Sequence, residues 1–345
     1  MERLYLSDYT PKSELVVEEH IITTPKFPVI DVHTHFGALV LGDQYDKLYD
    51  TKEIVEKYKG LGVEKVVNLD GSYGPELDRM LKKIHPYEDY ILTFGSVDVS
   101  RIDDQGFESY VRKTLLESIS KGIKGLKFWK NISLVLRDKN GKYIRVDDLR
   151  LKVIWETAAE FKLPILIHIA DPVAFFKPIN NFNERYEELQ IHPDWSYYKP
   201  GLFSFEELME MQENLISSNP DTTFIIAHVG SYSENLKFVM ECLEKYPNMY
   251  VDIAERISEL GRQPYSSRKF FIKFQDRILF GTDATAINHR YPINYRFLET
   301  WDEYFDYSYE PFYPQGRWKI YGIGLEDDVL KKVYYENAKK LLNIK

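Results

Sequence analysis

Eight short apolar runs recur along the chain, and stretches with a helical pattern lie between them. Each run is rich in Val, Ile, Leu or Phe and is bounded by turn residues, which is typical of a buried strand. The runs span residues 29–35, 63–70, 91–98, 123–128, 165–168, 223–228, 249–253 and 278–283, and the clearest helical patterns span residues 51–61, 107–121, 149–161, 204–218 and 235–245. Strand followed by helix, repeated along the chain, predicts an α/β fold in which a parallel sheet closes into a (β/α)8 TIM barrel.

The sequence gives no sign of a division into domains. No Ser/Gly-rich linker and no break in composition interrupts its 345 residues, so we expect a single domain over residues 1–345. Residues 1–28 precede the first apolar run and are expected to form an N-terminal arm. Residues 327–344 follow the last run and are expected to form a closing helix.

Composition and charge argue against several classes of protein. The net charge of −9 disfavours a nucleic-acid surface, and no apolar run approaches the ~18 residues that a membrane span needs. Cys242 is the only cysteine, so neither a disulfide nor a thiolate metal site is expected. Glu2, Arg3 and Asp8 precede any apolar stretch, which argues against a signal peptide. We therefore expect a cytoplasmic protein that acts on a small molecule, and the sequence leaves a homo-oligomer open.

Polar residues that can bind a metal stand at the ends of four of these runs. His33 and His35 end the first run, and His168, His228 and Asp283 end the fifth, sixth and eighth. The packing of a buried strand does not require a His or an Asp at its end. A divalent ion at the mouth of a barrel does require such residues, because neutral His and carboxylate are its ordinary ligands. Barrel enzymes carry their chemistry at the C-terminal ends of the strands. The pattern therefore predicts a metal centre at the mouth.

Side-chain alternation supports this arrangement. Alternate residues of a strand face opposite ways, so Asp31 is expected to share the inner face with His33 and His35 while Val32 points away. Two other runs alternate in the same way, and their inner faces are expected to carry Leu166 with His168 and, on the last run, Leu279, Gly281 and Asp283.

The order of these residues along the chain resembles that of the amidohydrolase superfamily of metal-dependent barrels. The order is a His-x-His pair on strand one, a His on strand five, a His on strand six and an Asp on strand eight. The resemblance covers residues from about 29 to 284, and the Tyr-Glu-Asn-Ala-Lys segment at 335–339 also looks like the C-terminal helix of the family. The surrounding sequence looks most like the branch that contains aminocarboxymuconate-semialdehyde decarboxylase, resorcylate decarboxylases and several lactone or ester hydrolases.

The resemblance implies roles for five residues. His33, His35, His168 and Asp283 would bind a divalent ion, with Zn²⁺ preferred because His with one carboxylate suits zinc better than Mg²⁺ or Ca²⁺. His228 would be either a ligand of a second ion or a general acid/base beside a single ion. A water made acidic by the ion would complete the shell.

Lys127 bears on the number of ions. In members of the superfamily with two ions, a carboxylated lysine on strand four bridges them, and Lys127 faces inward if Leu126 and Phe128 pack outward. Lys127 could bridge two ions as a carbamate, bind a substrate carboxylate as an ammonium, or extend toward the mouth. The branch resemblance favours one ion, with Lys127 as a substrate contact.

Two arginines beyond strand ends are further candidates for binding a carboxylate. Arg256 follows the seventh run and Arg290 the eighth, and a guanidinium can hold a carboxylate through two hydrogen bonds. For each of them, a solvated loop arginine is the alternative. His289 is a weaker pocket candidate. Three other histidines end no strand and are expected to lie outside the site: His20, His85 and His192.

Two aromatic-rich segments could surround the site. Residues 171–203 form a long connection, and a lid or a subunit contact is expected there because the segment holds Phe175, Phe176, Trp195, Tyr197 and Tyr198. Residues 301–321 are also dense in aromatics and could wall the pocket or pack under the barrel.

Together these features favour a metal-dependent hydrolase that uses activated water on an ester, lactone or amide of a small carboxylated substrate. Asp283 would take up the proton, and His228 would polarise or protonate the substrate. A non-oxidative decarboxylase of an unsaturated or aromatic acid is one alternative, because it would use the same ligands. A barrel that binds a metal or small molecule without catalysis is the other.

Overall fold

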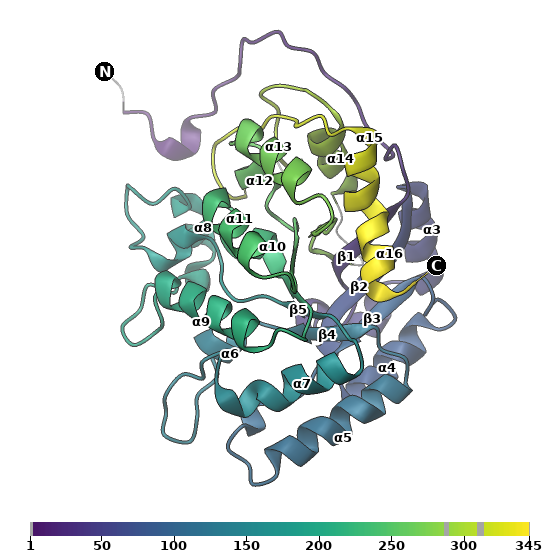
Figure 1. Cartoon of the computed structure of the whole chain (residues 1–345). Coiled ribbons are helices and arrows are strands. Elements are labelled where there is room, and N and C mark those ends of the chain that lie inside the picture. Colours follow the sequence, from purple (N-terminus) through teal and green to yellow (C-terminus); the bar gives the residue numbers. More distant parts are fainter. Residues whose placement is uncertain (1–2, 286–289, 309–313, 345) are drawn as a thin grey trace.

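The computed structural model describes residues 3–285, 290–308 and 314–344, and within them nine parallel strands form one sheet (Figure 1). The strands follow the order β8-β7-β6-β5-β4-β3-β2-β1-β9, so β1 to β8 each lie beside their neighbours in sequence. Their bounds are β1 Val29–His35, β2 Val63–Ser72, β3 Ile91–Gly95, β4 Gly125–Phe128, β5 Ile165–Ile167, β6 Phe224–Ile226, β7 Met249–Asp252, β8 Ile278–Leu279 and β9 Ala284–Thr285.

The last segment of the sheet returns to the first strand. β8 and β9 belong to one stretch of chain, residues 278–285, and β9 pairs in parallel with the end of β1. The N–H of Val32 donates to the carbonyl of Phe280 over 3.0 Å, and the N–H of Asp283 donates to the carbonyl of His33 over 2.8 Å. Because β9 and the residue that follows β8 both bond to β1, the sheet closes on itself. The strands therefore enclose an interior, as expected for a barrel.

An apolar interior fills this space. Leu166, Ile225 and Leu279 point inward and belong to one buried cluster, whereas Ile165 and Ile167 belong to the cluster between the strands and the helices. The alternation predicted for the fifth run is therefore confirmed. Two layers of core, one on each face of every strand, explain why the strands read as near-continuous apolar runs.

Helices cover the outer face of the strands. α9 starts at a capping box, in which the Ser204 hydroxyl accepts from the N–H of Glu207 and the Glu207 carboxylate accepts from the N–H of Ser204. The longer helices of this layer are α3 Thr51–Gly60, α4 Gly74–Ile84, α5 Phe107–Ser120, α7 Lys152–Glu160 with the 3₁₀ turn η3 Leu149–Leu151 before it, α9 Phe205–Ser218, α11 Leu236–Lys245, α13 Pro264–Lys273 and α14 Tyr291–Glu299.

The C-terminal segment closes the end of the barrel opposite the mouth. It consists of α15 Asp327–Lys331, the π-helical turn η6 Lys332–Glu336 and α16 Asn337–Leu342. Ala338 and Leu342 belong to the interior cluster of the barrel. The Asn337 amide donates to the carbonyls of Gln275 and Ile278, over 2.7 and 2.9 Å, which ties the segment to the start of β8.

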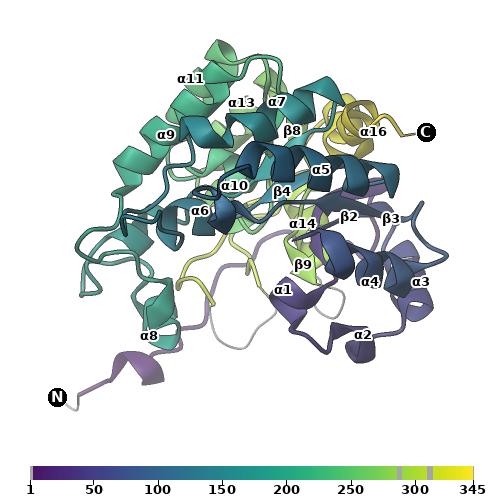
Figure 2. The same ribbon diagram turned by 90° about the horizontal axis from the view of Figure 1, so that it is seen from below.

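Shorter elements follow the C-terminal ends of the strands. Figure 2 places α1 and α8 at one end of the molecule and α16 at the other. The elements at the mouth are α1 Ala38–Leu41, α2 Tyr45–Leu48, η2 Val99–Arg101, α6 Asn131–Leu134, η4 Val173–Phe176, α8 Tyr186–Ile191, η5 Pro193–Trp195, α10 Ala227–Gly230 and α12 Ile257–Leu260.

Residues 3–28 run outside the barrel and do not join the sheet (Figure 1). Their one short helical turn is η1 Leu6–Asp8. Across the described ranges, no helix has both the length and the apolar character that crossing a lipid bilayer requires.

The predicted alternation on the first strand is wrong at Asp31 and Val32. Val32 lies in the interior cluster, whereas the Asp31 carboxylate accepts from the hydroxyls of Thr282 (2.5 Å) and Tyr291 (2.7 Å), and Tyr291 is part of the outer core. The pairing register between β1 and β2 shifts between Asp31 and Thr34. An irregularity of this kind inserts a residue and reverses the alternation. His33 reaches the mouth because of that shift.

Candidate metal centre

Two histidines of β1 and an aspartate beyond β8 come together at the mouth. The Oδ1 atom of Asp283 lies 2.9 Å from Nε2 of His35 and 3.5 Å from Nε2 of His33. Both rings are buried, whereas the Asp283 side chain is 28% exposed to solvent. These three residues form one group with metal-ligand spacing. The structure therefore brings together three of the strand-end residues that the sequence predicts as ligands.

Asp252, the last residue of β7, fixes the orientation of His33. Its Oδ2 atom lies 2.8 Å from Nδ1 of His33, and its Oδ1 atom accepts from the N–H groups of His228 and Ala254, over 2.9 and 3.1 Å. Burial alone would raise the pKa of Asp252, but His33 and these donors hold it below its ordinary value. An ionised carboxylate only accepts, so Nδ1 of His33 carries the proton and its Nε2 lone pair faces Asp283.

Sequence reasoning missed Asp252, although a signal was present. It stands near the end of the seventh apolar run, in the same position that drew attention to Asp283 on the eighth. Its contact with His33 joins strands 219 residues apart in sequence, so its partner could not be read from the run itself.

His228 and His168 form the other half of the centre. Nδ1 of His228 donates to the carbonyl of Ala254 over 2.8 Å, so its Nε2 atom keeps a lone pair in the neutral ring. Nε2 of His168 lies 3.2 Å from Oδ1 of Asp171, which is itself held by Lys130. That contact leaves the lone pair of His168 on Nδ1, which faces Nε2 of His228 at 3.3 Å. Two lone pairs at this distance repel unless a proton or a metal ion lies between them, which is compatible with either role expected for His228.

The protonation states suit metal ligands. Burial lowers the pKa of His33, lowers that of His168 to about 4 and lowers that of His228 well below its ordinary value. Burial alone would raise the pKa of Asp283, but His33, His35 and His228 outweigh it and hold that pKa well below its usual range. The rings of His33, His168 and His228 are therefore neutral and the Asp283 carboxylate is ionised at pH 7, the forms in which these side chains bind metals.

The distances between the ligand atoms fit a divalent transition ion. Two ligands bound at ~2.0–2.1 Å to one tetrahedral ion lie roughly 3.3–3.4 Å apart. The separations here are 2.9 and 3.5 Å around Asp283 and 3.3 Å between His168 and His228. Nε2 of His228 lies 3.9 Å from Oδ2 of Asp283, so the two halves meet at that carboxylate. His168 adjoins His228 and is not part of the group formed by His33, His35 and Asp283.

Several residues of the centre and its surroundings have a strained, left-handed backbone conformation that orients their side chains. His228, Val229, Glu255 and Asp283 have φ angles of 58°, 57°, 52° and 60°. The residues of α10 around His228 therefore form a left-handed turn. A left-handed conformation is rare for residues other than Gly, Asn and Asp, and its cost is greatest for a β-branched residue such as Val229. Such strain is typical of functional sites.

Lys127 is buried beside the centre and faces inward, as predicted. Its neighbours Leu126 and Phe128 lie in the outer core, and its Nζ atom has no hydrogen-bond partner among the described residues. Nζ lies 4.4 Å from the centre of the Trp129 ring, which also packs against His35 at 5.1 Å. Burial lowers the pKa of Lys127 to about 8.

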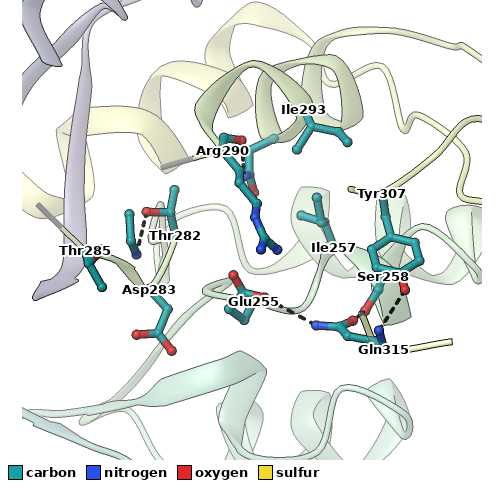
Figure 3. A pocket seen from close by; sticks show the side chains of 12 residues that line it. Glu255, Ile257, Ser258, Thr282, Asp283, Thr285, Arg290, Ile293, Tyr307 and Gln315 are labelled. Atoms are coloured by element: carbon teal, nitrogen blue, oxygen red, sulfur yellow. Dashed lines mark hydrogen bonds between the residues drawn. The ribbon is translucent and has the colours of Figure 1, made fainter. Parts of the chain in front are cut away.

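A hollow of about 80 Å³ opens beside Asp283 (Figure 3). Arg290 lines it, and its guanidinium is turned toward the same space as the Glu255 carboxylate (Figure 3). Arg256 is 7% exposed and donates to the carbonyl of Glu255 over 2.8 Å. Arg256 is therefore a buried residue near the site, and the solvated-loop alternative is wrong for it.

The aromatic segments lie where they can shape the mouth. In the connection 171–203, Phe175 packs on Trp195 and Phe176 on Tyr197, with ring centres 6.1 and 5.2 Å apart. In the segment 301–321, whose residues 309–313 lie outside the described ranges, Tyr307 and Gln315 line the hollow, so this segment walls the pocket.

The remaining histidines do not enter the centre. His20 pairs with Asp302, His85 pairs with Glu88, and His192 stacks on Trp195. His289 lies outside the described residues.

Comparison with known proteins agrees with this architecture. A family model described as amidohydrolase matches residues 30–344. No curated protein matches the sequence.

Several solved structures share the fold. A 2,6-dihydroxybenzoate decarboxylase complexed with 2,6-dihydroxybenzoate has a TM-score of 0.56 at 13% identity, covering 92% of this chain and 100% of that chain. A dihydroxybenzoic acid decarboxylase from a Polaromonas species, with bound manganese and the inhibitor 2-nitroresorcinol, has a TM-score of 0.56 at 14% identity, covering 92% and 97%. A 4-oxalomesaconate hydratase from Rhodopseudomonas palustris has a TM-score of 0.52 at 12% identity, covering 91% and 95%.

At these identities the likeness to solved structures concerns the fold, and it confirms the expected TIM barrel. The family model extends from the first strand to the closing helix and includes all the strand ends that form the centre. The protein belongs to the amidohydrolase family.

Proposed function

We propose that the protein is a metal-dependent hydrolase that acts on an ester, lactone or amide of a small carboxylated substrate. One observation carries the proposal. The partly exposed, ionised Asp283 carboxylate lies within 2.9–3.9 Å of the Nε2 atoms of three buried histidines, His33, His35 and His228, at the side of an open hollow. A base beside a set of free ligand atoms is what the activation of water requires.

His33, His35 and Asp283 would hold the ion, with His168 as a further ligand, and we favour one ion over two. Zn²⁺ is the preferred ion because the donor set is rich in imidazole with a single carboxylate. When bound, a divalent ion polarises a substrate carbonyl and acidifies a water molecule.

The residues of the chain would supply proton transfer. Asp283 accepts the proton released by the water, because its low pKa keeps it ionised and its side chain is partly open to the hollow. His228 has its Nδ1 proton committed to the carbonyl of Ala254, so only its Nε2 atom is free to receive a proton from Asp283. A proton held on Nε2 can then be donated to the leaving group.

Cationic residues around the centre would bind the substrate carboxylate. Arg290 lines the hollow, Lys127 is a buried ammonium beside Trp129, and Arg256 is buried next to Glu255. Arg290 is the best placed of the three, because its guanidinium faces the hollow (Figure 3). An arginine there holds the substrate with its reacting carbonyl toward Asp283.

Decarboxylation of an unsaturated or aromatic acid is the second candidate. Two structural neighbours are dihydroxybenzoate decarboxylases by name, and Phe128 and Trp129 give the mouth an aromatic wall. Delivery of a proton to carbon needs a donor that is protonated beforehand. His33, His168 and His228 have lowered pKa values, so hydrolysis fits the centre better.

A substrate panel separates these reactions. The full chain is loaded with Zn²⁺ or Mn²⁺ and incubated with carboxylated lactones, esters and amides and with phenolic acids, and release of acid and of carbon dioxide are measured in parallel. We expect acid without carbon dioxide, and turnover at least ~10²-fold lower in the Asp283→Asn variant. Carbon dioxide from the phenolic acids would establish the lyase instead. Inertness of the metal-loaded protein across the panel would favour a barrel that binds without catalysis.

A further inference from the structure

We propose that the cavity over the C-terminal ends of β2, β3 and β4 is a second compartment of the site, and that it binds a cationic amine carried on an apolar part of the substrate. This inference rests on the proposed function, because the compartment serves a reaction only if the metal centre performs one. It assigns opposite charges to the two ends of the substrate, with the carboxylate toward Arg290 and the amine away from it.

The sizes of the two spaces at the mouth indicate where the body of a substrate sits. The hollow beside Asp283 holds about 80 Å³, whereas the cavity over β2–β4 holds about 770 Å³. Pockets for small molecules usually measure ~300–1,000 Å³. The hollow can take only a small group, so most of a substrate needs the larger cavity.

The larger cavity adjoins the metal centre. Trp129 lines the cavity and packs on His35 at 5.1 Å between ring centres. Asp70 also lines the cavity. Its Oδ2 atom accepts from the N–H of Phe36 over 2.9 Å, and Phe36 directly follows His35 in the chain. A molecule in the cavity therefore lies against the residues that support one ligand of the centre.

Apolar residues form much of the cavity wall. They come from α1, from the start of α4, and from the end of β4 and the segments that follow β3 and β4: Ala38, Leu39, Pro75, Val97, Val99, Phe128, Trp129, Ile132 and Leu136. Such a wall suits a ring or a short hydrocarbon chain.

The charged residues of the wall are all acidic. Asp43, Asp70, Glu76 and Asp98 line the cavity, and no Lys, Arg or His is among its lining residues in the described part of the chain. Arg79, which borders Glu76 at 3.6 Å, is engaged by Asp46 at 2.9 Å. A carboxylate on the substrate would be repelled here, whereas an ammonium would be attracted.

Asp70 is the group that points to a specific ligand. It is only 7% exposed, and its Oδ1 atom is buried with no hydrogen-bond partner among the described residues. Gly37 leaves room for the carboxylate, because a Cβ atom there would lie 2.7 Å from Oδ2. A buried carboxylate oxygen without a donor is costly, and an ammonium N–H on the substrate would supply the donor.

Direct binding of charged probes tests the compartment. The metal-loaded full chain is titrated by calorimetry with phenethylamine, with 3-phenylpropionate of similar size and opposite charge, and with 3-phenylpropanol as the neutral member. We expect phenethylamine to bind at least about 10-fold more tightly than 3-phenylpropanol, the effect of one charged hydrogen bond. Equal or tighter binding of 3-phenylpropanol overturns the proposal, whereas phenylpropionate measures how strongly the metal centre and Arg290 bind a carboxylate.

Two variants locate the binding. Asp70→Asn removes the charge but keeps an oxygen for the N–H of Phe36, so the fold should survive, and we expect phenethylamine affinity to fall at least about 10-fold. Asp104→Asn removes the same charge from an exposed residue that does not line the cavity and should change affinity by less than about threefold, because exposed charges interact weakly. Unchanged affinity in Asp70→Asn refutes the assignment. If that variant fails to fold, the charge selectivity of the unaltered protein still decides.

A metal-free sample separates the compartment from the centre. Binding of phenethylamine should persist after the metal is removed, and its loss would mean that the amine binds the ion, which also refutes the proposal. The assay needs no turnover. A protein that hydrolyses panel substrates without amine selectivity refutes the compartment alone, and a protein that binds the amine without hydrolysis refutes the reaction alone.

Discussion

The substitution Asp252→Asn tests how the metal centre is organised. The Asp252 carboxylate does two things at once. Its Oδ2 atom accepts from Nδ1 of His33 at 2.8 Å, and its Oδ1 atom accepts from the N–H groups of His228 and Ala254. An amide has the same size but only one accepting oxygen, so it cannot satisfy both sides.

The two orientations of the amide have different costs. If its oxygen stays with the two backbone donors, its NH₂ group faces His33 and forces the ring proton from Nδ1 to Nε2, which removes the lone pair that faces Asp283. If the amide turns over, two buried N–H groups lose their acceptor, at about 1–3 kcal/mol each. The first orientation is cheaper. Because outer partners of a metal-binding His affect affinity by about 10–100-fold, we expect a loss of that size for Zn²⁺, with less than ~1 kcal/mol change in the stability of the metal-free protein.

Zn²⁺ affinity is measured by competition with a chelator, and the free energy of unfolding of the metal-free protein by urea titration. Asp302→Asn is the matched control, because Asp302 is a buried carboxylate that pairs with His20 and Arg296 and does not belong to the centre. It should lower stability and leave Zn²⁺ affinity unchanged. Native Zn²⁺ affinity in Asp252→Asn would show that the carboxylate does not set the ring proton of His33.

Four further outcomes follow from the centre. After exhaustive dialysis the protein should retain about one equivalent of a divalent ion by elemental analysis, and less than roughly a tenth, with no binding on titration, would contradict the site. Asp283→Asn should lower turnover at least ~10²-fold while circular dichroism stays native, and near-native turnover would exclude it as the proton acceptor. Lys127→Ala should leave metal content unchanged and weaken a carboxylated substrate by ~1.5–3 kcal/mol in binding measurements, whereas loss of one equivalent of metal would indicate a bridging carbamate. His228→Asn should keep its metal and lose turnover, and loss of metal would make it a ligand.

Features that depend on a single run of residues, such as strand positions and strand-end ligands, could be predicted from the sequence. The runs at 29–35 and 165–168 became β1 and β5 with nearly the expected bounds, because apolar composition and turn residues are local properties. The same locality placed His33, His35 and Asp283 at strand ends, and the barrel then brought those ends together. The inward direction of Lys127 followed from its two apolar neighbours.

Other features depend on contacts between distant segments. Asp31 faces the helical layer because the register between β1 and β2 shifts, and no pattern within the first run reveals that shift. The place of His168 beside His228 depends on Asp171, which holds the opposite nitrogen of the ring. The eighth run was expected to be a strand as far as residue 283, but β8 ends at Leu279 and Asp283 has a positive φ.

The centre lies across the seam where the barrel closes. His33 and His35 belong to the first strand and Asp283 to the last segment, and the same seam is held by Asp31 with Thr282, 251 residues away in sequence. An ion bound there would act as a cross-link between the beginning and the end of the barrel. Because the site does not exist in the unfolded chain, the free energy of binding the ion stabilises the closed barrel. Metal binding at the centre would therefore affect the stability of the barrel as well as its chemistry. We expect heat or denaturant to open the metal-free barrel first between β1 and β9.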